Sequence, residues 1–314
     1  MIVNIQSDFP KYNYQYSVAE TGIIGVYGIS GSGKSSLLRA IAGFQPDTLG
    51  KIELNNKILL DTANKRSATV QKCSYMSQNS ILFPHWTVRQ NLDFAESHAK
   101  VNQKITSQII AALNCQELLD KYPNQLSGGE KQRVAFIRAL IGSRTSQLML
   151  LDEPFSALDE VIRTTALEIL NQYKKNNLIF LVTHDINELY HYADEILSIN
   201  NGNIQYQNSI SNAMACGKYQ LPIACKLIID NKQQIIYADD VSLSLNPLSD
   251  SSIIHQIPVT LIDLTKTHKT SLLKLKTGDN QTLFAKITTQ SLNRLQLTLN
   301  QHVMANFKAT SFKP

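Results

Sequence analysis

The stretch Gly28–Ser35 constrains the fold of this chain more than any other part of its sequence. It reads GISGSGKS, which fits the pattern GxxxxGK[ST]. An apolar, β-branched run precedes it at 21–28, and Leu and Ile at helical spacing follow it at 34–44. A strand, a glycine turn and a helix in this order predict a phosphate-binding loop, because glycine lets backbone N–H groups approach phosphate oxygens closely. The alternative, a chance glycine turn, does not account for the flanking strand and helix.

The loop predicts which residues would contact a nucleotide. The Lys34 ammonium should reach the β- and γ-phosphates, and the Ser35 hydroxyl should ligate Mg²⁺. The start of the helix adds a favourable dipole for the anion. The predicted ATP contacts of this segment are Gly28, Ser30, Gly31, Ser32, Gly33, Lys34, Ser35 and Ser36.

The first part of the chain alternates strands and helices. The apolar runs QLMLLDEP at 147–154 and NLIFLVTH at 177–184 flank a helical run at 161–175. Near-continuous apolar strands separated by helices are typical of a parallel sheet covered on both faces. Between about 86 and 146 helix follows helix, which predicts a helical subdomain inserted into this α/β domain of residues 1–212.

A second domain is expected after the α/β domain, since 314 residues are enough for two. Short alternating runs rich in Val, Ile, Thr and Phe, with turn residues between them, predict a small all-β module at 249–314. The intervening residues 213–248 are predicted to be a β-rich connector.

Composition narrows the class of protein without identifying it. With 43% hydrophobic and 18% charged residues the chain should be globular rather than disordered. The net charge of +5 fits an anionic substrate, membrane proximity or simply solvated lysines. We expect no membrane-spanning helix and no secretory signal, because no apolar window of about 18 residues occurs and the N-terminus lacks a charged segment followed by an apolar one. The cysteines lack metal-site spacing and are expected to be free thiols in a reducing cytoplasm: Cys73, Cys115, Cys216 and Cys225.

Two acids follow the apolar run at 148–151. In a nucleotide hydrolase with a phosphate loop, one carboxylate holds the Mg²⁺ shell and a neighbouring group orients or deprotonates water. Asp152 is predicted to do the first and Glu153 the second. The alternative is an ordinary polar turn before Pro154.

A second glycine-containing stretch, LSGGEKQR at 126–133, precedes another helical run. Ser127 and Glu130 have the spacing of a capping box, so a well-capped helix is the simple interpretation. Gly128 and Gly129 suggest more, because a glycine inside a helix costs about 1 kcal/mol relative to alanine. Without side chains there, the N–H groups of the first turn form an exposed anion site.

The first 205 or so residues resemble the ATP-binding subunits of ABC transporters, because six motifs follow one another in the order typical of that family. They are GISGSGKS, YMSQ with Gln78, LSGGEKQR, LMLLDEP, SALD with Asp159, and VTHD with His184. The resemblance implies ATP and Mg²⁺ as cofactors and a head-to-tail homodimer. In such a dimer Ser127, Gly128 and Gly129 would serve the partner's ATP.

The resemblance also implies roles for single residues. Glu153 would be the general base and His184 would contact the γ-phosphate. Gln78 would touch Mg²⁺ or the water, in the loop that senses the membrane partner, so that the expected metal contacts are Ser35, Gln78 and Asp152. Asp159 would cross the dimer interface. The family stacks adenine on an aromatic residue near the N-terminus, for which Tyr12, Tyr14 and Tyr16 are candidates, although alternating tyrosines equally fit one face of a strand.

Two further segments bear on the cargo. Asn79–Ala95 resembles the segment of oxyanion importers that docks a coupling helix of the permease. The C-terminal residues resemble the TOBE/Mop class of small OB-like β barrels, most of all those of molybdate importers, with Ser251, Ser252 and Lys286 as candidate oxyanion contacts. Ile254 and His255 replace the Arg-Asn pair usual in that class, so a dimerisation module without ligand remains the alternative.

These resemblances predict an ATPase that drives molybdate import through transmembrane permease subunits. It would lie peripherally at the cytoplasmic face of the inner membrane and work with a periplasmic or lipid-anchored substrate-binding protein, without nucleic acid. Tungstate, sulfate, ferric iron or a polyamine are alternative cargoes. A non-transport ABC ATPase is disfavoured, because the chain has one cassette and no heptad run between its phosphate loop and LSGGEKQR.

Overall fold

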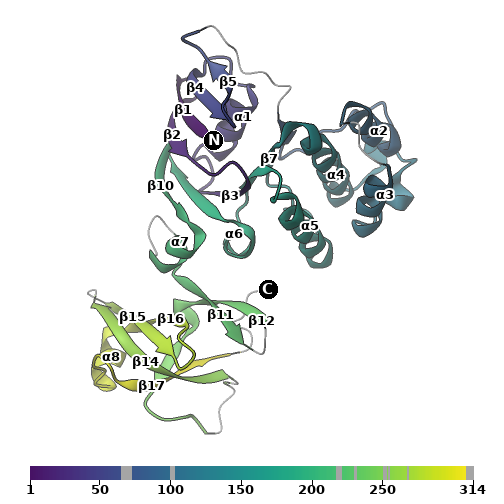
Figure 1. Ribbon diagram of the computed structural model, residues 1–314. Helices are drawn as coiled ribbons and strands as arrows, with labels where there is room; N and C mark the ends of the chain where they lie inside the picture. Colours follow the sequence, from purple (N-terminus) through teal and green to yellow (C-terminus); the bar gives the residue numbers. More distant parts are fainter. Residues whose placement is uncertain are drawn as a thin grey trace. The chain divides into compact units, whose positions relative to one another are not determined.

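The computed structural model describes residues 1–64, 73–99, 103–216, 221–229, 232–249, 253, 255–266 and 269–308. The chain forms two compact units, Met1–Asn208 and Ser209–Pro314, which are treated separately below (Figure 1). Within the described residues no helix is long and apolar enough to cross a membrane.

The first unit is built on a ten-stranded sheet in the order β5-β4-β1-β2-β10-β9-β3-β8-β7-β6. The strands are β1 (Ile2–Asp8), β2 (Lys11–Ser17), β3 (Gly22–Tyr27), β4 (Leu49–Leu54), β5 (Lys57–Asp61), β6 (Ser74–Met76), β7 (Leu148–Asp152), β8 (Leu178–Val182), β9 (Glu195–Asn200) and β10 (Asn203–Ser209). The half that contains β3, β6, β7, β8 and β9 pairs in parallel, whereas β1, β2, β4 and β5 pair antiparallel with one another, and β2 also pairs in parallel with β10. The predicted α/β class with a parallel sheet is confirmed for the parallel half.

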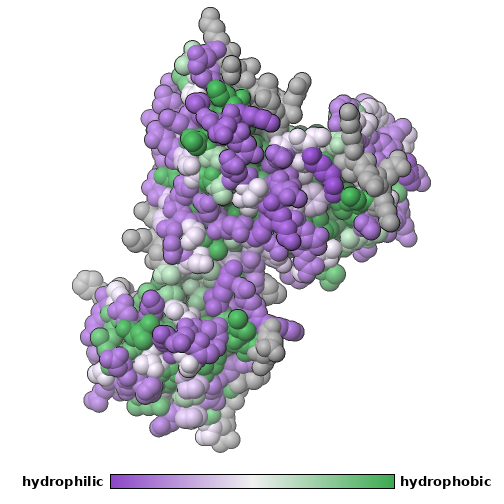
Figure 2. Space-filling view, viewed as in Figure 1, coloured by the Kyte–Doolittle hydropathy of each residue, from purple (hydrophilic) through white to green (hydrophobic). Residues whose placement is uncertain are grey.

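The central strands are buried along their whole length. Every residue of β7 and β8 is buried, as expected for strands covered on both faces. Helices α1 (Lys34–Ala42) and α6 (Ile186–Tyr192) pack on strands of the parallel half, and α5 (Glu160–Tyr173) packs against α6. Polar residues occupy most of the visible surface of this unit (Figure 2).

The helical subdomain lies beside the parallel half of the sheet (Figure 1). It consists of α2 (Val88–Ala99), α3 (Gln103–Ala112), two short 3-10 turns at Gln116–Leu118 and Pro123–Gln125, and α4 (Gly128–Ser146). Helix α4 packs on both α2 and β6, so it connects the subdomain to the sheet. The capping box predicted for its start is confirmed, because Ser127 Oγ accepts a hydrogen bond from Glu130 N (3.3 Å) and Glu130 Oε2 accepts one from Ser127 N (2.7 Å).

The second unit is mostly β structure. It holds α7 (Ile210–Cys216), a hairpin of β11 (Ala224–Ile229) and β12 (Lys232–Tyr237), a 3-10 turn (Ala238–Asp240), β13 (Ser242–Ser244), β14 (His255–Lys266), β15 (Thr270–Thr277), β16 (Thr282–Thr288), α8 (Thr289–Arg294) and β17 (His302–Phe307). Five strands form an antiparallel sheet in the order β13-β17-β14-β15-β16. Leu227 of β11 and Ile236 of β12 share one core with Leu261 of β14 and Leu275 of β15. The segment expected as a connector therefore contributes to the core of this unit.

Candidate nucleotide-binding site

The predicted phosphate loop connects β3 to α1, as its sequence context requires. Gly31 and Gly33 have φ angles of 77° and 109°, which side chains rarely adopt. Gly33 is also closely surrounded, because a Cβ there would come within 2.7 Å of the Tyr14 hydroxyl. That hydroxyl donates a hydrogen bond to Gly33 O (2.8 Å), so β2 supports the loop from behind. Ser30 and Gly31 are exposed, while Ser35 and Ser36 are half-buried at the start of the helix.

Lys34 is buried and turns back onto its own loop. Its Nζ donates to Gly28 O (2.7 Å) and Ile29 O (3.0 Å). Burial lowers the pKa of Lys34, and the nearby carboxylates of Glu153 and Asp152 oppose that shift. Ser32 Oγ is also buried and has no hydrogen-bond partner among the described residues. A buried cation and an unpaired hydroxyl at the start of a helix fit a phosphate group.

Asp152, at the end of β7, is almost fully buried, with 2% of its surface exposed. Burial raises its pKa, whereas a hydrogen bond with the Ser35 side chain acts in the opposite direction. A hydroxyl and a carboxylate in contact are hard oxygen donors of the kind that Mg²⁺ prefers, together with water and phosphate oxygens. The residues present therefore fit the predicted metal. No cluster of three or more His, Cys, Asp or Glu ligands occurs in the described residues, so a metal here would depend on other oxygens as well.

The three predicted catalytic side chains lie together. Glu153 Oε1 is 2.5 Å from His184 Nε2, and Glu153 Oε2 accepts a hydrogen bond from Gln78 Nε2 (3.0 Å). Glu153 has a φ of 50°, an uncommon conformation for a residue with a side chain. The carboxylate is thus held between an amide and an imidazole, next to Asp152 and close enough to Lys34 to influence its pKa.

The residues around His184 are tied to the start of α5. Arg163 lies 3.7 Å from an Asp185 oxygen and 3.8 Å from Glu188 Oε1, which join α5 to α6. Burial raises the pKa of Glu188 to about 7. Asp159 caps α5, because its Oδ1 accepts a hydrogen bond from Ile162 N (3.0 Å).

The stretch predicted to serve a second nucleotide begins helix α4. Ser127 is the N-cap, and Gly128 and Gly129 form the first turn. A Cβ on Gly128 would meet no described atom within 4 Å, whereas one on Gly129 would come within 2.7 Å of Ala157 O. Gly128 is therefore open to its surroundings, and Gly129 is packed against the turn that follows β7.

The tyrosines near the N-terminus do not offer the adenine platform considered from the sequence. Tyr12, Tyr14 and Tyr16 are 3%, 0% and 6% exposed, because β2 points alternate residues into the core. The strand-face alternative is confirmed, and the adenine assignment is wrong for these residues. Phe9, which the sequence analysis did not single out, is 85% exposed in the turn between β1 and β2.

Gln132 was also not predicted from the sequence as a residue of the site. It is 3% exposed in α4, and its side chain makes hydrogen bonds to the turn after Glu153. A signal was present, since Gln132 lies one helical turn before the buried Phe136 and so falls on the inner face of the helix.

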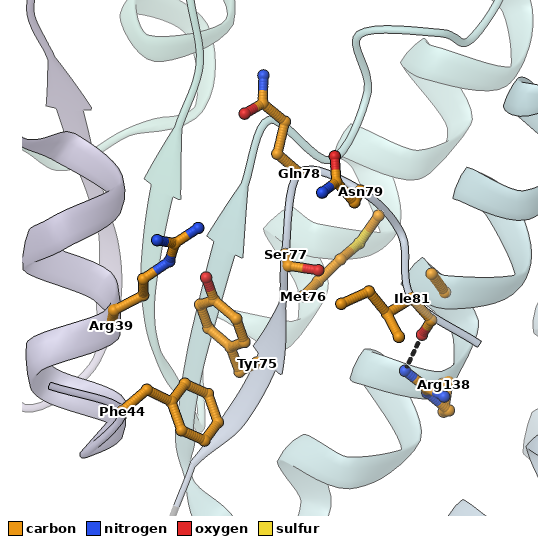
Figure 3. Close-up of a pocket in the computed structure, with 10 residues that line it drawn as sticks. Arg39, Phe44, Tyr75, Met76, Ser77, Gln78, Asn79, Ile81 and Arg138 are labelled. Atoms are coloured by element: carbon orange, nitrogen blue, oxygen red, sulfur yellow. Dashed lines mark hydrogen bonds between the residues drawn. The ribbon is translucent and has the colours of Figure 1, made fainter. Parts of the chain in front are cut away.

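A pocket of about 520 Å³ lies beside Gln78 (Figure 3). Arg39 and Phe44 line it from the α1 side, Tyr75 from β6, and Arg138 from α4. The Phe44 and Tyr75 rings meet edge to face with centroids 5.3 Å apart. Arg138 Nη2 donates a hydrogen bond to Ile81 O (2.5 Å), which fixes the segment after Gln78 to α4.

An aromatic cluster continues from this pocket along Asn79–Ala95. Phe83, Trp86 and Phe94 have ring centroids 4.6 to 5.3 Å apart, and the Arg138 guanidinium lies 5.5 Å from the Phe83 centroid. Phe83 and Phe94 are 41% and 40% exposed, and Ile81 is 65% exposed. This part of the surface is therefore apolar and accessible.

The predicted oxyanion contacts of the second unit are not brought together in the described part of the chain. Ser251, Ser252 and Ile254 lie outside the described residues. Lys286 forms an exposed ion pair with Asp239 (Nζ to Oδ1, 3.0 Å). The His255 ring stacks on Phe307 with centroids 5.7 Å apart.

The described cysteine side chains, those of Cys73, Cys115 and Cys225, are free thiols, as predicted. Burial raises the pKa of each to about 11, so they are poor nucleophiles and metal ligands. The Cys216 side chain lies outside the described ones.

Comparison with known proteins agrees with these features. The family model described as ABC transporter matches residues 12–156, and the model described as TOBE domain matches residues 251–313. The chain is 32% identical to the molybdenum import ATP-binding protein ModC of Saccharophagus degradans, over 97% of this chain and 95% of that protein. It is 30% identical to the protein of the same name from Mannheimia succiniciproducens, over 95% of each.

Solved structures resemble the first unit. A dimeric ATP-binding cassette in a post-hydrolysis state, bound to ADP and Pi, is 25% identical with a TM-score of 0.55, over 63% of this chain and 89% of that one. The ATP-binding subunit of an ABC transporter has a TM-score of 0.60 at 21% identity, over 69% of this chain and 92% of that one, which shows the shared fold.

Proposed function

This chain belongs to the family of molybdenum import ATP-binding proteins among the ABC transporters, and we propose on that premise that it hydrolyses ATP to drive molybdate through a membrane permease. The observation that carries the proposal is the position of the Glu153 carboxylate. It lies between the Gln78 amide and the His184 imidazole, beside Asp152 and near the buried Lys34. That arrangement is suited to activating water next to a phosphate-binding loop.

Each side chain has a defined task in this proposal. Lys34 exchanges the carbonyls of its own loop for β- and γ-phosphate oxygens. Glu153 takes the proton of the attacking water, whose oxygen bonds to the γ-phosphorus while the bond to the β-bridging oxygen breaks and ADP leaves. His184 contacts the γ-phosphate and keeps the water positioned for proton transfer to Glu153.

Mg²⁺ completes the site in this proposal. The Ser35 hydroxyl, the Asp152 carboxylate and the Gln78 amide oxygen would hold it, and the ion would neutralise charge on the phosphates. Gln78 contacts Glu153 through its amide nitrogen, so its amide oxygen would be the atom that could act as a metal ligand.

Ser127, Gly128, Gly129 and Asp159 would serve the nucleotide of a second copy in a head-to-tail homodimer. The openness of Gly128 supports this, because a helix N-terminus without side chains exposes N–H groups to an anion. The permease would dock on the pocket beside Gln78 and the aromatic cluster of Phe83, Trp86 and Phe94. The protein would then lie peripherally at the cytoplasmic face of the membrane, and a separate substrate-binding protein would deliver the cargo.

Phe9 is our candidate for the adenine contact in place of the tyrosines. It is exposed in the β1–β2 turn, and β2 approaches the phosphate loop through Tyr14 and through the Asn13 N to Gly202 O bond (2.8 Å). Gly202 N in turn donates to Ser32 O (2.8 Å). An exposed ring in the hairpin whose second strand contacts the loop suits a base that needs a stacking surface.

The decisive experiment is Glu153→Gln in the full chain assembled with its permease. We expect steady-state ATP hydrolysis to fall by about 10²-fold or more, since general-base catalysis contributes that much, while ATP binding is retained. Normal turnover by this variant would overturn the assignment of the base. The cargo is tested by uptake, where failure of the assembled transporter to accumulate molybdate, with tungstate and sulfate as competitors, would overturn the molybdate proposal.

A further inference from the structure

Gln132 connects helix α4 to the turn that carries Glu153. Its Nε2 donates to Glu153 O (3.0 Å) and to Ser156 Oγ (3.1 Å), and its Oε1 accepts from Ala157 N (2.8 Å). One buried amide thus spans the whole turn from 153 to 157. Both of its polar atoms are satisfied, as expected for a buried amide that specifies one arrangement.

The turn needs such support because Glu153 is in a costly conformation. A left-handed residue with a side chain costs roughly 1–2 kcal/mol. Glu153 N donates to Val182 O (2.9 Å), which ties Glu153 to β8. Glu153 O accepts from Ser156 Oγ (3.3 Å) within the turn and from Gln132 Nε2 (3.0 Å), and the bond from Gln132 ties it to α4.

The stretch Ser127–Gly129 lies at the start of the same helix. Gly129 is packed on Ala157 O so closely that a Cβ would come within 2.7 Å of it. Gln132 lies one turn further along and bonds to the N–H of the same Ala157. The start of α4 and the turn after β7 are therefore joined at Gly129 and Gln132, and a displacement of either moves the other.

We propose that Gln132 is a positioning residue that holds the Glu153 backbone and the 156–157 turn against the start of α4, so that nucleotide bound at Ser127–Gly129 sets the direction of this chain's own Glu153 carboxylate. The inference rests on the proposed function, because it assumes that Glu153 is the base and that Ser127–Gly129 bind the partner's nucleotide. It adds a physical link between those two sites within one chain.

The chemistry of the amide explains what each substitution removes. Gln132→Met keeps the length of the side chain and removes all three hydrogen bonds. Gln132→Glu keeps an acceptor for Ala157 N but brings a carboxylate against Glu153 O, so the hydrogen bond from α4 to Glu153 is lost while the contact with Ala157 remains. Ser74→Ala is a matched control, because Ser74 Oγ donates a buried hydrogen bond to Ala139 O (2.7 Å), two turns further along the same helix.

The test measures kcat, the KM for ATP, ATP binding and Tm for the full chain with its permease. We expect Gln132→Met and Gln132→Glu to lower kcat by about 10²-fold, the effect of a misplacement of roughly 1 Å, with KM and ATP binding changed less than about threefold. Ser74→Ala should also lower Tm, by less than Gln132→Met because it removes one buried hydrogen bond rather than three, and should leave kcat within about twofold of wild type.

Three outcomes would count against the inference. It is overturned if both Gln132 variants keep kcat near that of Ser74→Ala, or if kcat falls only in proportion to Tm. Equal losses of kcat and ATP binding would also overturn it, because they indicate collapse of the phosphate loop rather than misdirection of Glu153. If wild type hydrolyses ATP and Glu153→Gln does not, the proposed function stands whatever the Gln132 variants show. Absence of hydrolysis by wild type would instead refute the function itself.

Discussion

The chain carries two glycine-containing stretches that we propose as anion sites, and they are built on different physical principles. In the phosphate loop Gly31 and Gly33 take φ angles of 77° and 109°, so the shape of the loop itself depends on glycine. At the start of α4, Gly128 and Gly129 belong to a regular helix with an ordinary capping box. There the glycines serve other ends: Gly128 leaves the first turn open, and Gly129 allows close packing on Ala157.

A glycine pair in a sequence therefore has no single structural meaning. Glycine in the loop is required by the backbone, and any side chain there is strained whatever space surrounds it. At the start of α4 the helix backbone does not require glycine, and the reason for it is the surroundings: Gly128 leaves space open and Gly129 packs on Ala157. Substitution of a loop glycine should therefore distort the loop backbone, whereas substitution of a glycine at the helix start should remove a packing contact or a ligand.

The largest effect should come from Gly33→Ala. The new Cβ would be strained at a φ of 109° and would come within 2.7 Å of the Tyr14 hydroxyl. We expect ATP affinity to fall by about 10²-fold or more and the free energy of unfolding by roughly 1–3 kcal/mol, the cost of a disfavoured backbone conformation. Nucleotide titration and thermal melts measure the two quantities.

Gly31→Ala separates the effect of backbone strain from that of the steric clash with Tyr14 that Gly33→Ala also introduces. Gly31 also has a positive φ, but a Cβ there would meet no described atom within 4 Å. It should therefore cost less stability than Gly33→Ala. Equal costs would mean that the Tyr14 contact is unimportant.

An intermediate effect is expected from Gly129→Ala. Its Cβ would press on the backbone oxygen of Ala157, which cannot move without displacing the 153–157 turn. We expect a loss of about 1–3 kcal/mol in unfolding free energy, as for overpacking of a well-packed contact, together with slower ATP turnover.

Gly128→Ala is the matched comparison on the same helix turn. It should raise stability by up to about 1 kcal/mol, because alanine is the better helix former, yet still slow turnover by filling the exposed anion site. Unaltered turnover in Gly128→Ala would argue that no nucleotide approaches this turn. Chemical denaturation and ATPase assays distinguish the two variants.

The features that could be predicted from the sequence depend on local patterns, and those that could not depend on tertiary contacts. The phosphate loop, the strand ending in Asp152 and the Ser127 capping box are local patterns, and the structure has each of them where it was expected. The meeting of Glu153, Gln78 and His184 depends on three separate segments and was inferred only from family resemblance. The roles of these residues stay predictions.

The sequence-based predictions that failed, or could not be made, depend on contacts between distant parts of the chain. The tyrosines of β2 alternate in a way that a hydrophobic face explains as well as a ligand platform does, and only the fold shows that all three are buried. Gln132 looked like part of a polar run, EKQR, although its partners lie more than twenty positions away along the chain. The pairing of Lys286 with Asp239 likewise joins distant positions.

The smallest effect should come from Ser127→Ala, which tests the cap rather than a glycine. The substitution removes the acceptor for Glu130 N and leaves the Glu130 carboxylate bonded to Ser127 N. Loss of an N-cap typically costs about 1 kcal/mol, so a small fall in Tm is expected. If the hydroxyl also binds the partner's nucleotide, turnover must fall more than this loss of stability explains. Ser127→Thr keeps a capping oxygen and should restore Tm, and its turnover then reports whether the anion site tolerates one extra methyl group. A Ser127→Ala variant with reduced Tm and normal turnover would assign Ser127 to the cap alone, and the contrast between the two anion sites would then rest on the helix glycines.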